Sequence, residues 1–223
     1  MVTNQQAIRA LFRVRNDRAG NLPPLPGIFP DQQAPIVRVG IDGERELVMA
    51  RWGMPTPPAF RKGAVDRGVT NIRNTASPHW RQWLKPQFRC LVPTSSYCDE
   101  YTDSQPKVPH WFALDDDRPP FAFAGIWCVW NGARGPAKAP VEGNHLLYGF
   151  LTTDANEVVR PIHAKAMPVM LTTLEECDTW LSAEPAEVLK LQRPLPVDQL
   201  KIVEKGERED GATDATKRSD LLL

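Results

Sequence analysis

Residues 121–152, FAFAGIWCVW NGARGPAKAP VEGNHLLYGF LT, contain two β-type runs with no helical segment between them, Phe121–Val129 and Leu146–Thr152. Such short runs of aromatic, β-branched and other apolar residues are typical of strands. Further runs of this kind lie on both sides of the stretch: Ile36–Val39, Glu46–Trp52, Phe88–Val92, His110–Leu114 and Val169–Leu171. Because these strands do not alternate regularly with helices, the sequence predicts an α+β fold built on a largely antiparallel, curled sheet.

Short helices are expected around this sheet. Proline fixes the backbone and donates no hydrogen bond, so 22 prolines against 14 glycines disfavour long helices. Residues 3–15 predict an opening helix capped by Thr3. The other predicted helices are one opened by Ser77 and Pro78, Asn156–Arg160 capped by Asp154, one from Thr173 to Leu181 that begins with a Thr173–Glu176 capping box, and Pro185–Gln192.

The domain organisation expected from these patterns is a single domain, residues 1–205, followed by a charged tail, residues 206–223. A chain of 223 residues can bury a core without disulfides or a metal. It contains no run of about eighteen apolar residues and no apolar signal segment, which excludes the transmembrane and secreted classes. The expected state is a cytoplasmic monomer that does not associate with membranes.

The charge and cysteine counts restrict the possible ligands. With 27 basic and 27 acidic residues the net charge is zero, so nucleic acid would have to bind a local patch. The four cysteines form no CxxC pair and the four histidines are scattered. This spacing argues against a structural zinc site, and no metal or cofactor is expected.

Residues 61–89 form the one strongly basic block, with seven Lys or Arg against a single acid, Asp66. Trp80, Trp83 and Phe88 are interleaved with these bases. Basic side chains neutralise phosphates and aromatic faces stack on unpaired bases, so the block suits single-stranded nucleic acid. An equally weighted alternative is a solvated loop whose tryptophans belong to the core.

Two segments contain candidate acid–base residues. Glu100, or its neighbour Asp99, lies beside aromatic residues that could raise its pKa, although such an acid is more often an exposed turn residue. His163 lies between two prolines with Lys165 nearby, where it could move protons or serve as a structural histidine. Cys98 with His163 would suit a cysteine-type hydrolase, but no recognised nucleophile motif surrounds Cys98.

Several short strings follow one another in a fixed order along the chain. They are RWGMP (51–55), NIRNT (71–75), RCLVP (89–93), Glu100-Tyr101, FAFAGIW (121–127), LTTDAN (151–156), and Ile162-His163 with Met167-Pro168-Val169. Together they span roughly residues 45–172, and although each is weak alone, their shared order and spacing are specific. In this order they resemble the SRAP family, the SOS response-associated peptidases or abasic-site processing proteins.

The resemblance implies a single α+β domain with a central barrel-like sheet and a groove for single-stranded DNA. Family members recognise abasic sites and crosslink to them through an N-terminal cysteine. Its amine forms a Schiff base with the sugar aldehyde and its thiol then closes a thiazolidine ring. Carried over by motif, Asn71, Glu100 and His163 would be the catalytic residues. The implied DNA contacts are Arg51, Trp52, Arg73, Arg89, Tyr101 and Lys165.

The sequence departs from the family pattern at three places. The segment Ser95–Tyr101 and the spacing from His163 to Met167 are each one residue longer, which leaves the choice between Glu100 and Asp99 open. The third departure is Val2, which stands where the family has cysteine. Three explanations for Val2 stay open. The sequence start is placed too late, the chain is a variant that binds DNA without capturing the sugar, or the Val2 amine forms a reversible imine.

The expected function is recognition of abasic sites in single-stranded DNA, with crosslinking in a form that carries the N-terminal cysteine. From the sequence alone, whether the chain is an enzyme stays open. Two alternatives remain: a non-catalytic single-stranded DNA-binding module that uses residues 61–89, and a hydrolase that uses Cys98.

Overall fold

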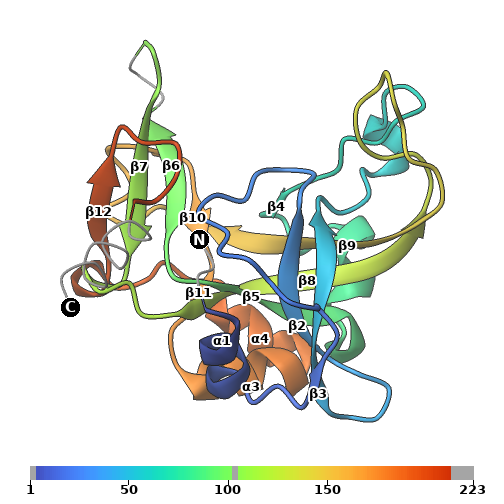
Figure 1. The fold of residues 1–223 in the computed structure, drawn as a ribbon, viewed down its shortest axis with the longest axis horizontal. Coiled ribbons are helices and arrows are strands. Elements are labelled where there is room, and N and C mark those ends of the chain that lie inside the picture. Colours follow the sequence, from blue (N-terminus) through green and yellow to red (C-terminus); the bar gives the residue numbers. More distant parts are fainter. Residues whose placement is uncertain (1–3, 102–104, 212–223) are drawn as a thin grey trace.

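The computed structural model describes residues 4–101 and 105–211 (Figure 1). Its sequence of elements is an α+β fold, as predicted. The strands are β1 (Asn16–Asp17), β2 (Gln33–Val39), β3 (Arg45–Trp52), β4 (Asn71–Ile72), β5 (Arg89–Thr94), β6 (Tyr97–Tyr101), β7 (Val108–Ala113), β8 (Phe121–Asn131), β9 (Asn144–Thr153), β10 (Met167–Pro168), β11 (Met170–Leu171) and β12 (Lys201–Lys205).

Five strands close into a barrel in the order β3-β2-β5-β8-β9. Neighbours along this order are antiparallel, and β9 returns to pair parallel with β3. The closing pairs are Arg51 with Leu147 and Trp52 with Tyr148. The predicted barrel-like, largely antiparallel sheet is therefore confirmed.

Alternation along the barrel strands produces two apolar cores. Ile36, Cys90 and Tyr148 belong to a cluster that takes residues from all five barrel strands and from no α-helix, so this cluster fills the barrel. Their neighbours Val37 and Leu91 belong to the other cluster, which includes the buried residues of the helices. Successive side chains of a barrel strand thus point alternately into the barrel interior and into the core beneath the helices.

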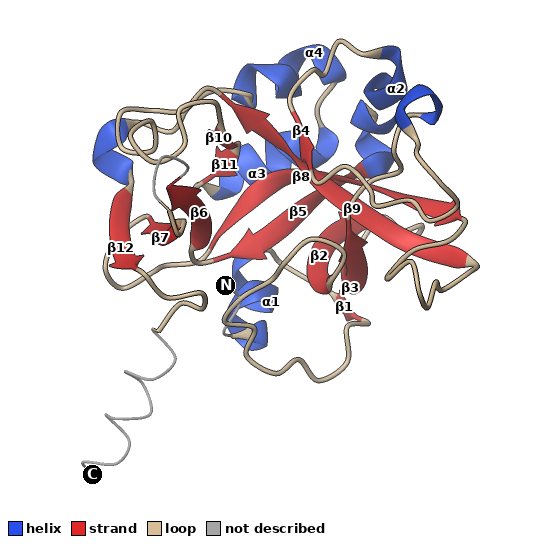
Figure 2. Ribbon diagram, turned by 90° about the horizontal axis from the view of Figure 1, so that it is seen from above, coloured by secondary structure: helices blue, strands red, loops and turns tan. Residues whose placement is uncertain are grey.

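The helices are short, as the proline content predicts, and they cover the outside of the barrel (Figure 2). The α-helices are α1 (Gln5–Leu11), α2 (Pro78–Arg81), α3 (Leu174–Ser182) and α4 (Pro185–Val188). The 3₁₀ turns are Pro58–Phe60, Gln82–Leu84, Pro86–Phe88, Leu189–Leu191 and Val197–Gln199. The capping box expected of Thr173 is present, with Glu176 as its partner.

Two helix predictions need comment. The opening helix is capped by Asn4, whose side chain accepts from the Ala7 N–H, while Thr3 lies outside the described residues. The helix predicted for Asn156–Arg160 is wrong, because this segment forms turns. The Asn156 side chain accepts from the Val158 and Val159 N–H groups and donates to the Leu195 carbonyl, which fixes the chain in a capped turn.

A second sheet, β12-β7-β6, stands beside the barrel (Figure 1). Within it, β6 is the outer strand, and β7 is its one pairing partner among the residues that the structure describes. From the segment expected as a tail, residues 206–211 are described, and Asp210 is 1% exposed. Its carboxylate accepts from the Ser96 hydroxyl and from Arg118 Nε, so this part of the segment packs on the domain.

Among the described residues, no helix has the length and apolar character needed to cross a membrane.

Candidate active site

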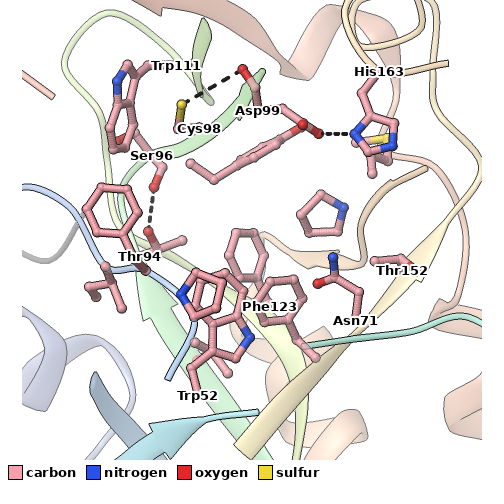
Figure 3. A pocket seen from close by; sticks show the side chains of 18 of the residues that line it. Trp52, Asn71, Thr94, Ser96, Cys98, Asp99, Trp111, Phe123, Thr152 and His163 are labelled. Carbon is pink, nitrogen blue, oxygen red and sulfur yellow. Dashed lines mark hydrogen bonds and ion pairs between the residues drawn. The ribbon is translucent and has the colours of Figure 1, made fainter. Parts of the chain in front are cut away.

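A cavity of about 410 Å³ lies where the barrel meets the second sheet (Figure 3). Its walls come from barrel strands, from β6, from the chain crossing at residues 27–30 and from the turn before β10. Trp52, Phe123 and Phe150 supply an aromatic wall, and Trp52 stacks on Phe150 with ring centroids 5.3 Å apart. The cavity therefore joins an apolar surface, suited to a flat or sugar-like ligand, to polar groups on the opposite side.

His163 and Asp99 form a close pair of ionisable side chains in this cavity, with His163 Nδ1 2.7 Å from Asp99 Oδ2. An ionised carboxylate only accepts hydrogen bonds, so Nδ1 carries the hydrogen. His163 Nε2 is then the ring nitrogen that can take or release a proton. The two side chains are 33% and 24% exposed, which leaves them reachable by a ligand.

The turn around His163 is held rigidly. The His163 N–H donates to the Val159 carbonyl, and Val159 and Ile162 are buried in the core that fills the barrel. After the turn, β10 pairs with Thr152 and Thr153 of β9. These contacts fix the imidazole against the barrel.

Alternation along β6 decides which acid faces His163. Tyr97 and Asp99 share one face of the strand, whereas Cys98 and Glu100 point to the other face. Glu100 lines the cavity as well, but its carboxylate lies 3.2 Å from Lys107 Nζ. The acid beside the histidine is thus Asp99, which the one-residue length difference in this segment had left open.

Asn71 reaches the cavity from β4, which pairs parallel with β9 at Phe150. Its side chain is exposed and receives no hydrogen bond from the described part of the chain. Figure 3 shows the Asn71 amide facing the same space as Asp99 and His163. The three residues Asn71, Glu100 and His163 therefore line one cavity, as the resemblance implied, with Asp99 added to them.

The residues expected to contact DNA are placed unequally. Trp52 lines the cavity, and its Nε1 donates to the Thr70 carbonyl at 3.2 Å. Arg73 is exposed near His163, where it pairs with Asp154 and donates to the Lys165 carbonyl. The Lys165 side chain is exposed on the same turn.

Arg51 and Tyr101 lie further from the cavity wall. Arg51 is directed at Asp31, with Nη1 3.2 Å from Oδ2 and 2.9 Å from the backbone oxygen. Tyr101 ends β6, its ring centroid 6.3 Å from that of His110. Neither residue lines the cavity, so any DNA contact they make lies outside it.

Arg89 requires a correction, because it is only 1% exposed. Its guanidinium donates to the carbonyl of Ala183, the residue that ends α3, and lies 5.6 Å from the Trp180 ring centroid. Burial lowers the pKa of Arg89 to about 10. A helix end attracts a cation to its free carbonyls, and this structural role keeps Arg89 away from DNA.

The aromatic residues of the basic block belong to the core or pack beside it. Trp80 is buried and Trp83 packs against the helix-covered core, while Phe88 contacts Trp127 edge to face. The structure therefore favours the alternative in which these rings are packing residues.

Cys98 reaches the protein surface and lines the cavity, but partial desolvation of its thiol by the cavity wall, and then the Asp99 charge, raise its pKa to about 11. A thiolate nucleophile needs the opposite shift. Searched over the described residues, no group of three or more His, Cys, Asp or Glu side chains is arranged to hold a metal ion.

Sequence reasoning did not find the residues that shape the cavity. Phe123, Phe150 and Trp111 were assigned only to strands, yet all three line it. Ser96, also in the wall, is held by the buried Asp210. The apolar runs predicted strands at these positions, but they carried no signal for which side chains would line a cavity.

The sequence model of the SOS response associated peptidase family, SRAP, matches residues 1–206. The chain belongs to the SRAP family. No curated protein matches it in sequence. Among solved structures, a Bordetella bronchiseptica protein is 25% identical with a TM-score of 0.69, covering 92% of this chain and 95% of its own.

Two further structures resemble this SRAP protein. One from Bacteroides thetaiotaomicron is 25% identical with a TM-score of 0.60, covering 77% of this chain and 72% of its own. A phage-related protein from Bordetella bronchiseptica is 19% identical with a TM-score of 0.62 and covers 89% of each chain, which is a likeness of fold alone.

Proposed function

We propose that this protein recognises abasic sites in single-stranded DNA and holds the opened sugar in the cavity beside His163. The observation that carries the proposal is the His163–Asp99 pair inside a half-apolar cavity of an SRAP chain. An abasic site lacks its base, so its sugar is free to turn out of the strand and enter the cavity. We also propose that the protein acts in the cytoplasm, as the sequence analysis expects.

The proposed roles follow from the positions of the side chains. His163 Nε2 exchanges a proton with the sugar oxygen or aldehyde, and the Asp99 charge stabilises the protonated imidazole. The Asn71 amide orients the sugar hydroxyls, while Trp52 packs against the sugar or a flanking base. Arg73 and Lys165, exposed beside the turn, bind the flanking phosphates.

The covalent part of the proposal concerns position 2. Closing a thiazolidine needs an amine and a thiol on one N-terminal residue, and this polypeptide carries Val2. We propose that a form beginning Met-Cys makes the heat-stable crosslink, whereas the polypeptide with Val2 does not.

The test compares binding to two DNA strands by fluorescence anisotropy. Wild-type protein is expected to bind a single strand with one abasic site more tightly than the intact strand. His163→Ala removes the imidazole that would hydrogen-bond the sugar, so this preference is expected to fall by about tenfold or more. The intact strand is expected to bind the variant and the wild type equally.

His145→Ala is the matched control, because His145 is a half-exposed histidine on β9 that does not line the cavity. Equal binding of both strands by the wild type, unchanged in His163→Ala, would support a lesion-indifferent DNA-binding module instead. Binding of neither strand would overturn the nucleic-acid assignment altogether.

A further inference from the structure

The cavity holds a second acid–base pair that the proposed function leaves unused. Lys107 Nζ lies 3.2 Å from Glu100 Oε2, and both residues line the cavity. Among the described residues that form its wall, Lys107 is the one lysine. It therefore brings a primary amine, with a carboxylate beside it, to the space that holds His163.

The edge position of β6 explains why two acid–base pairs meet in one cavity. Asp99 and Glu100 point to opposite faces of this strand. Among the described residues β6 pairs with β7 alone, and side chains from both faces of the strand line the cavity. Lys107 directly precedes β7, whose first residue Val108 pairs with Tyr101.

The two pairs differ in what they can do chemically. The imidazole of His163 can move a proton but forms no stable bond with an aldehyde. The Lys107 amine can, once the neighbouring carboxylate accepts its proton. About half of each side chain is exposed, 51% for Lys107 and 56% for Glu100, so a ligand can displace the ion pair.

We propose that Lys107 captures the aldehyde of the opened abasic sugar as a reversible imine. This inference rests on the proposed function, because it needs the sugar in the cavity. Lys107 gives a proton to Glu100, and the neutral amine adds to the carbonyl carbon, forming a C–N bond while the carbonyl oxygen takes a proton. The resulting carbinolamine loses water and leaves a protonated imine, so one aldehyde and one ammonium group give one iminium ion and one water.

The experiment is reductive trapping on single-stranded DNA with one abasic site. Sodium cyanoborohydride converts the imine to a secondary amine that survives heating, and denaturing gels measure the adduct. Wild-type protein is expected to be trapped on abasic DNA, and the intact strand, which has no aldehyde, gives no adduct. Without the reductant, heating releases the DNA.

The decisive variant is Lys107→Arg, which keeps the positive charge beside Glu100 but carries no primary amine. Its trapped adduct is expected to fall by at least about tenfold. Lys138→Arg is the matched control, because Lys138 is exposed and does not line the cavity, and its trapping is expected to equal that of the wild type. Peptide mass mapping of the wild-type adduct is expected to place the modification on Lys107.

Any one of three results would overturn this inference. These are trapping that persists in Lys107→Arg, an adduct that maps to the N-terminal amine, and no trapping of the wild type. Anisotropy without reductant, on the same proteins, separates these outcomes from failure of the proposed function. A protein that prefers abasic DNA but is not trapped binds the lesion without using Lys107. One that shows neither property loses both proposals.

Discussion

Asp99 and Glu100 are neighbours in the chain, yet they hold different partners in the cavity. Asp99 fixes the imidazole of His163, and Glu100 pairs with Lys107. A strand directs consecutive side chains to opposite faces. A shift of one position along β6 therefore separates the acid that pairs with a histidine from the acid that pairs with a lysine. The resemblance implied Glu100 but left Asp99 open as the acid, and the geometry places Asp99 beside the histidine.

The Cys98 thiol provides a prediction at the same scale. Because burial and the Asp99 charge raise its pKa to about 11, iodoacetamide is expected to alkylate it slowly at pH 7. The rate is expected to rise about tenfold per pH unit until the pH nears that pKa. Mass spectrometry of the modified peptide over a pH series measures this.

The control for that series is Cys98→Ser, which reports the three remaining cysteines, all of them buried. Rapid alkylation at neutral pH that depends on His163 would contradict the prediction and revive the cysteine-hydrolase alternative.

At the scale of elements, the sequence predicts those whose signal is local. The barrel strands alternate inward and outward residues, and the Thr173–Glu176 capping box marks the start of α3. In contrast, β6 was not predicted, because two adjacent acids, Asp99 and Glu100, interrupt the apolar residues of 97–101. The segment Asn156–Arg160 has a helical composition, but the Asn156 side chain closes a turn there instead.

Asp66 provides a prediction about the loop that precedes β4. Burial opposes ionisation of its carboxyl, but donation from the Thr56 hydroxyl and the Gly68 and Thr56 N–H groups lowers the pKa below 3.8. A carboxyl with a lowered pKa stabilises the fold above its ordinary pKa, and this contribution is lost as the pH falls through the folded-state value. Asp66→Asn is therefore expected to reduce the free energy of unfolding by about 1–3 kcal/mol at pH 7.

Urea unfolding of wild type and variant from pH 7 to pH 3 measures this difference, which is expected to shrink as the pH falls below 3.8. Asp117→Asn is the control, because Asp117 is exposed and its carboxylate makes no hydrogen bond or ion pair with any described residue. A difference that stays constant over the whole pH range would contradict the assignment of these hydrogen bonds to the ionised carboxylate.

At the scale of the whole molecule, the fold makes a site from residues that lie far apart in the sequence. Trp52, Asn71, Asp99 and His163 come from β3, β4, β6 and the turn before β10, and they meet only because the barrel closes beside a second sheet. Motif order pointed to three of these four residues. No local sequence pattern shows where a cavity forms beside the barrel, so the cavity and its aromatic wall could not be predicted from the sequence.

The role of the basic residues in the segment 61–89 also could not be predicted from the sequence. Composition left residues 61–89 as either a DNA-binding block or a solvated loop with core tryptophans. In the structure, Arg89 donates to the Ala183 carbonyl at the end of α3, and Asp66 accepts from the Thr56 N–H within the loop. Trp80, buried under the helix layer, is a core residue. A charge count does not show which bases are already paired inside the protein, and that information came only from the folded structure.

The central claim is that the cavity accepts the abasic sugar, and filling the cavity tests it most directly. Ala166 lies in the wall, so Ala166→Phe adds a ring to that space, whereas the exposed Ala164 lies on the same turn outside the wall. The measurement is the ratio of affinities for abasic and intact single-stranded DNA, by anisotropy at one salt concentration. The account predicts that Ala166→Phe reduces this ratio to about one with intact-strand binding unchanged, while Ala164→Phe keeps the wild-type ratio. An Ala166→Phe protein that is folded and still prefers abasic DNA to the wild-type extent would contradict it.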